Sequence, residues 1–398
     1  MQTDSNDVKA KMKSFIEDIC STIGPRLPTS SAESEAATFL QKRFEQYGET
    51  GIEHFACHPG AYNAAFRLPL LLYILAVVLY WFLPVASLLL LISAVVVFVG
   101  NTMYTKEIID VLFPEKQSTN VICKIKPRGK TENLVIMSGH HDSNWEAPLF
   151  RKHPGISFFM GVHFVLVALL MLVLIIKFLL AAFSISFSYT LDLTLLVVFA
   201  AFIPLEIYTY INVISDRPVM GANDNLSALA VCLGVADHLS DPENLPENTE
   251  VWLCSFGCEE IGIRGARRFV ATHYDEIKGA SVVNLDIVGG KDDQLHIVTK
   301  EEIVVSESSE EMVEVLEKIF SDLSIKSGKG PVAFFTNSMA FVERGIKSVA
   351  VSSTYHGGLT RYQHTLEDTP DKLDYDLMED CLEVCNEYIK RIDSAKLH

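Results

Sequence analysis

Two long apolar stretches limit the folds open to this chain more than any other feature of its sequence. Residues 66–100 contain one charged side chain, Arg67, and residues 156–212 contain three, Lys177, Asp192 and Glu206. About 20 helical residues cross the ~30 Å apolar core of a bilayer, so the second stretch is long enough for two spans. The first is just long enough for a tight hairpin of two short spans, which flanking residues could lengthen. Pro84 divides the first stretch and the serine-rich turn FSISFSYT divides the second. We therefore predict four transmembrane helices, arranged as two hairpins.

The remaining segments, 1–65, 101–155 and 213–398, predict one discontinuous globular domain. An even number of spans returns the chain to the same side of the membrane each time, so the domain can assemble there. Positive charges near the span ends on the domain side outnumber Lys177 on the far side; they are Arg67, Lys106, Arg151, Lys152 and Arg217. By the positive-inside rule, these charges predict a multi-pass protein with its globular domain in the cytoplasm.

Other sequence features agree with this topology. The N-terminus, MQTDSNDVKAKMKSF, is polar and does not resemble a cleavable signal peptide. The eight cysteines form no compact disulfide framework, so we expect reduced thiols. Lys177 should reach the distal interface and pair with Asp192. His163 and Glu206 fall within the apolar stretches, where ionisable groups are candidates for function, and the sequence leaves their role open.

The charge balance excludes one class of partner. The chain carries a net charge of −17 and has no cluster of Lys and Arg, so we expect no nucleic-acid partner. The oligomeric state does not follow from the sequence.

The globular segments predict an α/β fold, because short apolar runs alternate with amphipathic helical patterns. A sheet of this kind is covered by helices on both faces. The predicted strands are 51–56, 119–126, 134–139, 250–256, 280–287, 295–299 and 347–351. The predicted helices are 33–47, 226–239, 262–273, 310–323, 338–344 and 375–392.

Strands 119–126 and 134–139 are predicted to form a hairpin across PRGKTEN. Both apolar insertions would then leave the domain near residue 140. Active sites of such sheets lie at the carboxyl ends of the strands, so we expect the cleft to face the bilayer.

Five segments carry candidate metal ligands. In GHHDS, His140 ends a strand, and Asp142 could orient its imidazole ring. In GANDN, Asp224 has two oxygens that could bridge two metal ions. SVVNLD places Asp286 in an apolar strand, where an unpaired charge is costly, and RYQHT supplies His364. Each segment alone also has an ordinary structural explanation, such as a helix cap for Asp224.

The fifth segment, CSFGCEEIG, ends an apolar strand in two adjacent carboxylates. Adjacent carboxylates repel each other unless cations or a shared proton compensate. We predict that Glu260 binds metal and that Glu259 stays free. Glu259 would be the general base for a metal-activated water and then the acid for the leaving amine.

In order and wording, these segments resemble the co-catalytic zinc aminopeptidase family, whose relatives include glutamate carboxypeptidases and glutaminyl cyclases. The resemblance extends from GPRLPTSSAESEAATFL to the last helix but leaves out both apolar insertions. It implies a three-layer α/β/α fold with a mixed sheet of about eight strands. It also implies two zinc ions, one held by His140 and Asp286, the other by Glu260 and His364, with Asp224 bridging them.

The resemblance further implies that Glu259 is the general acid and base and that Asp142 supports His140. Cobalt or manganese can occupy the same ligands. One departure lies where the family commonly has Ser, Asp and His before an aromatic residue: this chain has Thr336, Asn337 and Ser338 before Phe341. This departure concerns contacts around the site and none of the predicted ligands.

The function that follows is that of a membrane-embedded zinc metallopeptidase, most simply an aminopeptidase, with peptide substrates that include apolar ones. A glutaminyl cyclase-like acyltransferase or another amide hydrolase is the first alternative. The second is a binding protein on a peptidase fold that has lost its activity. The sequence does not determine the end of the peptide attacked or the residue preference.

Overall fold

The computed structural model describes residues 5–149, 156–301, 306–355 and 360–394. Arg151 and Lys152, which entered the topology prediction, lie outside these ranges. The chain forms two compact units. The first comprises Met1–Cys57, Glu115–Trp145 and Pro218–His398, and the second comprises His58–Pro114 and Glu146–Arg217.

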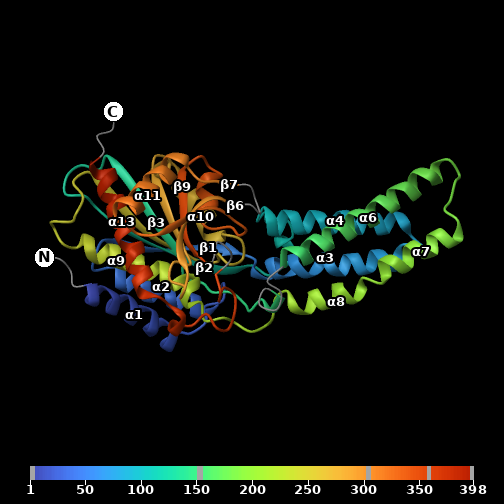
Figure 1. Cartoon of the computed structure of the whole chain (residues 1–398), viewed down its shortest axis with the longest axis horizontal. Helices are drawn as coiled ribbons and strands as arrows, with labels where there is room; N and C mark the ends of the chain where they lie inside the picture. Colours follow the sequence, from blue (N-terminus) through green and yellow to red (C-terminus); the bar gives the residue numbers. More distant parts are fainter. Residues whose placement is uncertain (1–4, 150–155, 302–305, 356–359, 395–398) are drawn as a thin grey trace. The chain divides into compact units, whose positions relative to one another are not determined.

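The first unit is built on a mixed sheet of nine strands, which Figure 1 shows with helices on both sides. The strand order is β1-β2-β4-β3-β5-β9-β6-β7, with β8 paired to β6. Strands β4, β3, β5 and β9 are mutually parallel, whereas β1, β2 and β6 join the sheet antiparallel. The strands are β1 Glu49–Cys57, β2 Lys116–Ile125, β3 Asn133–His140, β4 Thr249–Phe256, β5 Ser281–Asp286, β6 Gln294–Glu301, β7 Ser306–Glu307, β8 Ser327–Val332 and β9 Lys347–Thr354.

Successive side chains along the central strands belong to different cores, as the period of two of a β-strand requires. In β4, Leu253 packs into the larger core and Trp252 into the smaller one. The larger core also contains side chains of α1 Ser5–Thr22, α2 Ser31–Phe44, α9 Ala228–Leu239, α11 Glu310–Asp322 and α13 Tyr375–Ser394. The smaller core contains side chains of α10 Arg264–Ile277 and α12 Ser338–Val342. The predicted α/β/α layers are therefore confirmed.

The predicted hairpin between β2 and β3 is wrong, because β4 lies between them. Val121 of β2 pairs with Ser255 antiparallel, and His140 of β3 pairs with Phe256 in parallel. The prediction relied on the short connection between β2 and β3. In the structure, the apolar strand β4 pairs with β2 on one side and with β3 on the other. The first residues of β2 and the last residues of β3 nevertheless lie at the same end of the strands, with only β4 between them.

Helix α1 and strand β8 of the first unit were not predicted, nor was the two-residue strand β7. Helix α1 buries Met12, Phe15, Ile16 and Ile19, which have helical spacing within a polar segment. Strand β8, SGKGPV, has little β-propensity of its own and is held by its parallel pairing with β6.

Four helices of the second unit are long and apolar enough to cross a membrane, judged by length and composition. They are Pro59–Leu79, Pro84–Met103, Gly161–Ala182 and Tyr189–Asn212. The second combines α4 Pro84–Val97 with a π-helical turn, η1 Phe98–Met103, and the last combines α7 Tyr189–Ala200 with α8 Ile203–Asn212. The first of the four is α3 Pro59–Leu79, and the third lies within α6 Ile156–Ala182. Figure 1 labels α3, α4, α6, α7 and α8. A short turn, η2 Asp110–Leu112, follows η1 in the first insertion.

The first of these helices begins well before the predicted span, because Pro59 occupies its first turn, where proline is favoured. Inside the second unit, Lys177 lies 2.7 Å from Asp192, as predicted. The His163 Nδ1 atom lies 2.8 Å from Glu206, so these two ionisable side chains contact each other.

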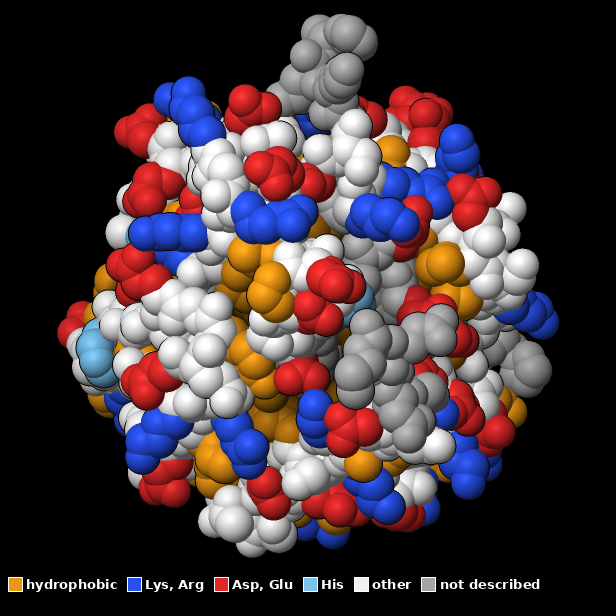
Figure 2. Space-filling model, turned by 90° about the vertical axis from the view of Figure 1, so that its left-hand side faces the viewer, with side chains coloured by type: hydrophobic (Ala, Val, Ile, Leu, Met, Phe, Trp, Pro, Cys, Tyr) orange, Lys and Arg blue, Asp and Glu red, His pale blue; other side chains and the backbone are white. Residues whose placement is uncertain are grey.

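All eight cysteines are free thiols, as predicted. Figure 2 shows acidic and basic side chains interspersed over one face of the molecule. This mixture is consistent with the absence of a basic run in the sequence.

Candidate metal centre

The predicted site residues lie close together at the carboxyl ends of the parallel strands. His140 is the last residue of β3, Asp286 is the last residue of β5, and Glu259 and Glu260 follow β4 after a short turn. Asp224 lies in the turn η3 Ala222–Ser227 just before α9. His364 lies in the loop before the short turn η4 Pro370–Lys372.

Five of these side chains form two groups that share Asp224. The potential ligand atoms of His140, Asp224 and Asp286 lie within 4.8 Å of one another, and so do those of Asp224, Glu260 and His364. Asp224 Oδ1 is 3.2 Å from His140 Nε2, while Asp224 Oδ2 is 3.2 Å from His364 Nε2. The two oxygens of one carboxylate therefore face different groups.

Glu259 belongs to neither group but borders the first, with its Oε2 atom 3.6 Å from His140 Nε2. Its Oε1 atom is buried and has no hydrogen-bond partner among the described residues. A buried carboxylate oxygen without a partner is costly in a folded protein. One oxygen of Glu259 is thus available to a substrate or a water molecule.

Asp142 has a broader set of contacts than the sequence predicted. Its Oδ1 atom is 3.3 Å from His140 Nδ1, on the side of the ring opposite the ligand group. Its two oxygens also accept hydrogen bonds from the backbone N–H groups of Glu259 and Glu260, each at 3.1 Å. Asp142 therefore links the His140 segment to the turn that carries both glutamates.

The charges of the site influence one another strongly. Burial alone would lower the pKa of His140, but Glu259, Asp142 and Asp224 raise it well above its usual range. Burial also raises the pKa values of Glu259 and Asp286, and neighbouring carboxylates add to both shifts. Burial opposes ionisation of Asp224 as well, but hydrogen bonds from His140 and His364 lower its pKa overall.

This donor set fits zinc. Imidazole nitrogens and carboxylate oxygens are zinc ligands, and three protein ligands leave a position open, as catalytic zinc requires. In the second group, Glu260 Oε1 is buried without a hydrogen-bond partner among the described residues, so it can serve a cation. His140 and His364 each direct Nε2 toward the carboxylates of their group.

Further buried polar residues around this centre were not predicted, among them Arg26, Asn144 and Asp368. Asn144 Nδ2 donates to Glu260 Oε2 at 2.6 Å, while its Oδ1 accepts from the Trp145 N–H at 2.7 Å. Arg26 and Asp368 bond to the backbone of the ligand segments. Their only sequence signal was their position in GPRLP and HTLEDTPD, beside residues chosen for other reasons.

A second buried polar cluster contains the residues where the sequence departs from the resembled family. Thr336 donates to Glu301 at 2.8 Å, and Ser338 Oγ lies 2.8 Å from Ser348 Oγ. Asn337 is fully buried and its side-chain amide has no hydrogen-bond partner among the described residues. No residue of this cluster belongs to the two ligand groups.

Replacing Glu301 with Gln should weaken the pH dependence of stability. Burial raises the pKa of Glu301 from 4.5 to about 8, although the Thr336 hydroxyl partly opposes this shift. Between these values the folded state retains a proton that the unfolded state has released, so the free energy of unfolding falls as the pH rises. In Glu301→Gln this contribution is absent. The measurement is the free energy of unfolding of the wild type and of Glu301→Gln, each in detergent, at pH 5, 7 and 9. Identical pH profiles for the two proteins would contradict the raised pKa of Glu301.

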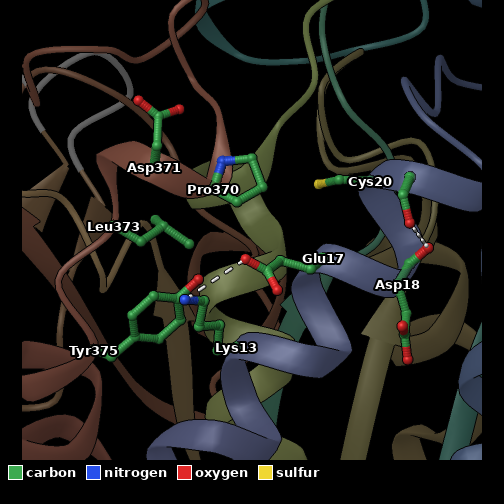
Figure 3. A pocket seen from close by; sticks show the side chains of 9 residues that line it. Lys13, Glu17, Asp18, Cys20, Pro370, Asp371, Leu373 and Tyr375 are labelled. Carbon is green, nitrogen blue, oxygen red and sulfur yellow. Dashed lines mark hydrogen bonds and ion pairs between the residues drawn. The ribbon is translucent and has the colours of Figure 1, made fainter.

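A surface depression lies elsewhere in the first unit. Figure 3 shows it between α1 and the segment around η4, with a volume of about 890 Å³. Lys13, Glu17, Cys20, Leu373 and Tyr375 are among its lining residues, and none of the lining residues is a predicted metal ligand.

Comparison with known proteins identifies a family that part of the chain resembles. Residues 207–389 match peptidase family M28, a segment that includes Asp224, Glu259, Glu260, Asp286 and His364. The resemblance to the co-catalytic zinc aminopeptidases is confirmed. His140 and Asp142 lie before the matched M28 segment, and the structure brings them to it.

Solved structures of low sequence identity share the fold. A zinc aminopeptidase from Bacillus subtilis is 14% identical, with a TM-score of 0.59, covering 98% of this chain and 96% of that one. A Zn-dependent exopeptidase from Parabacteroides distasonis is 14% identical, with a TM-score of 0.56 and 97% of each chain covered. A glutaminyl cyclase from an Acidobacteriales bacterium is 14% identical, with a TM-score of 0.57, covering 97% and 94%. No curated protein sequence matches the chain.

The M28 match supports a hydrolase of the peptidase type, and the solved structures show that the fold is shared. The roles of individual site residues remain predictions.

Proposed function

We propose that this protein is a membrane-embedded, zinc-dependent exopeptidase of the aminopeptidase type. The observation that carries the proposal is the division of Asp224, whose two oxygens face two separate ligand groups. In this proposal, His140, Asp224 and Asp286 hold one zinc ion, and Asp224, Glu260 and His364 hold the other. A carboxylate shared in this way suits two-metal hydrolysis of an amide bond.

Zinc ions bound to these ligands supply Lewis-acid polarisation of the scissile carbonyl and make water nucleophilic at neutral pH. Glu259 takes the proton from the attacking water and transfers it to the leaving amine nitrogen. Its place beside His140, outside both ligand groups, leaves it free to do so. Asp142 holds the backbone of Glu259 and Glu260 and orients the His140 ring.

Metal removal tests the catalytic part of this proposal. A peptide library is digested by the detergent-solubilised protein, and the products are identified by mass spectrometry. Treatment with a chelator should abolish cleavage, and zinc or cobalt should restore it. Stepwise loss of N-terminal residues supports an aminopeptidase, whereas loss of C-terminal residues contradicts that part of the proposal.

The substrate class is part of the same proposal. The globular segments are joined directly to four apolar helices, so we expect the substrates to be peptides at the membrane surface. We expect the enzyme to accept peptides with apolar residues, and cleavage restricted to short polar peptides would contradict this expectation.

Fractionation tests the membrane part independently. We expect the protein to sediment with membranes and to stay there after alkaline carbonate treatment, because four apolar helices partition into the bilayer. Detergent should release it. Release of the intact protein by carbonate alone would contradict integral membrane insertion while leaving the peptidase proposal standing.

Glutaminyl cyclase-like acyl transfer is the second candidate, since two glutaminyl cyclases share the fold. Cyclisation of N-terminal glutamine by a protein that holds one metal ion per chain would favour it over hydrolysis.

A further inference from the structure

Arg26 is a fully buried arginine to which the catalytic proposal gives no role. Its Nε atom donates to the carbonyl of His141 at 2.7 Å, and its two Nη atoms donate to the carbonyls of Met220 and Gly221, each at 2.9 Å. A fourth carbonyl bond, to Gly24 at 3.0 Å, connects the guanidinium to the backbone two residues before it. Arg26 therefore joins the segment that carries His140 to the segment that carries Asp224.

Asp368 makes the complementary connection. It is buried, lies four residues after His364, and accepts hydrogen bonds from the backbone N–H groups of Asn223 at 2.7 Å and Asp224 at 3.1 Å. Its own carbonyl accepts from the Ala222 N–H at 3.4 Å. Asp368 thus joins the His364 segment to the backbone of Asp224.

The segment between these two contacts has little room to move. Gly221 has a φ angle of +65°, a conformation that other residues rarely adopt. A Cβ atom there would lie 2.5 Å from the Asp224 carbonyl, 2.7 Å from Ser143 Cβ and 3.0 Å from Arg26 Nη2. The turn before Asp224 is therefore packed against the same arginine that binds its carbonyls.

Further bonds connect this turn to the strand that carries Asp286. Asn223 Oδ1 accepts from the Gly289 N–H at 2.9 Å. Asn225 donates to the carbonyl of Leu285 at 3.0 Å and accepts from the Ile287 N–H at 3.1 Å. The residues on both sides of Asp224 are thus fixed to β5 and the loop that follows it.

From these contacts we infer that Arg26 and Asp368 are positioning residues that hold Asp224 where its two oxygens serve both ligand groups, and that they thereby set the metal affinity. The inference rests on the proposed function, since it assumes that the two groups bind metal. Arg26 fixes the Asp224 segment to the segment that carries His140. Asp368 fixes the Asp224 segment to the segment that carries His364.

The chemistry of the two side chains suits this role. A guanidinium has five N–H donors in a rigid fork, so one arginine can bind carbonyls of several segments at once, which lysine cannot match. A carboxylate that accepts two backbone N–H groups forms charge-assisted bonds and fixes both amides. Residues that support metal ligands in this way typically change metal affinity by roughly 10- to 100-fold when they are replaced.

Cobalt binding by the metal-free, full-length protein in detergent tests the inference, since the visible spectrum of Co²⁺ reports both affinity and ligand geometry. Asp368→Asn and Arg26→Met should each weaken Co²⁺ binding by roughly 10- to 100-fold and alter the spectrum. Arg26→Lys should fall between Arg26→Met and the wild type, because it keeps the charge but loses the fork. Asp393→Asn is the control, since half-buried Asp393 likewise accepts two backbone N–H groups, those of Glu247 and Asn248 at 2.8 Å each, on a different part of the unit.

Unchanged affinity and spectrum in Asp368→Asn and Arg26→Met would overturn the inference. An equal loss of affinity in Asp393→Asn would also overturn it, because the effect would then come from general destabilisation. If Arg26→Met does not fold, Arg26→Lys and Asp368→Asn decide the result. Failure of the wild-type protein to bind Co²⁺ would instead overturn the proposed function, and the positioning role with it.

Discussion

Replacing Glu259 with Gln is expected to lower the rate of peptide hydrolysis by about 10²- to 10⁴-fold, the usual contribution of a general acid and base. The amide keeps the size of the side chain but cannot take a proton from water at neutral pH. Glu259 belongs to neither ligand group, so the metal content of Glu259→Gln should equal that of the wild type. The measurement is the hydrolysis rate at saturating zinc, together with elemental analysis of the same preparation.

Glu301→Gln provides the matched control for this experiment. Glu301 is also a buried glutamate of the first unit, but it belongs to neither ligand group and its hydrogen bond goes to Thr336. We expect its hydrolysis rate to stay within a few-fold of the wild type. An unchanged rate in Glu259→Gln would contradict the proposed mechanism, and a loss of metal in that variant would show that Glu259 is a ligand.

Replacing Asp224 with Ala is expected to remove both metal ions, and with them the hydrolytic activity. Asp224 is the one residue common to both groups, and each of its oxygens lies 3.2 Å from a different histidine. A ligand that binds only the folded state at 100 times its Kd stabilises that state by about 2.7 kcal/mol. We therefore expect zinc to raise the Tm of the wild type and to leave the Tm of Asp224→Ala nearly unchanged.

Asp286→Asn distinguishes the shared ligand from a ligand of one group. Asp286 belongs only to the group of His140, so this variant should lose one ion and keep the one near His364. Elemental analysis after dialysis against buffered zinc measures both variants. Equal metal content in Asp224→Ala and the wild type would contradict the bridging role.

The candidate site followed from the sequence because its residues stand where strands end. His140 and Asp286 close two parallel strands, and Glu259 and Glu260 follow a third, so strand ends far apart in sequence meet at one edge. The ordered motifs then gave each residue an expected partner. The structure brings all seven predicted residues together, and experiments of the kind described above test their roles.

The supporting residues could not be predicted in the same way. Arg26 and Asp368 bind backbone atoms that are 115 to 195 residues distant along the chain. A backbone carbonyl or N–H leaves no trace in the residue type, so only the folded geometry shows the contact. The double role of Asp142 was missed for the same reason, because its additional partners are the backbone N–H groups of Glu259 and Glu260.

In the fold, too, the features that depend on local sequence were predicted, and those that depend on pairing between distant segments were not. The central strands were predicted because apolar β-formers such as those of 250–256 occur in short runs. The position of β4 between β2 and β3 depends on pairing between distant segments, which a short connecting loop does not reveal. Strand β8 depends on its pairing with β6 in the same way. Helix α1 did carry a signal, the spacing of Met12, Phe15 and Ile19, which its polar surroundings obscured.

Quantification of metal in the purified full-length chain, paired with its hydrolytic activity, tests the central claim most directly. The shared position of Asp224 between two ligand groups predicts two zinc ions per chain, with peptide hydrolysis that disappears on chelation and returns with zinc. A protein that holds no metal and cleaves no peptide after incubation with zinc would contradict the account of this site as a two-metal hydrolase.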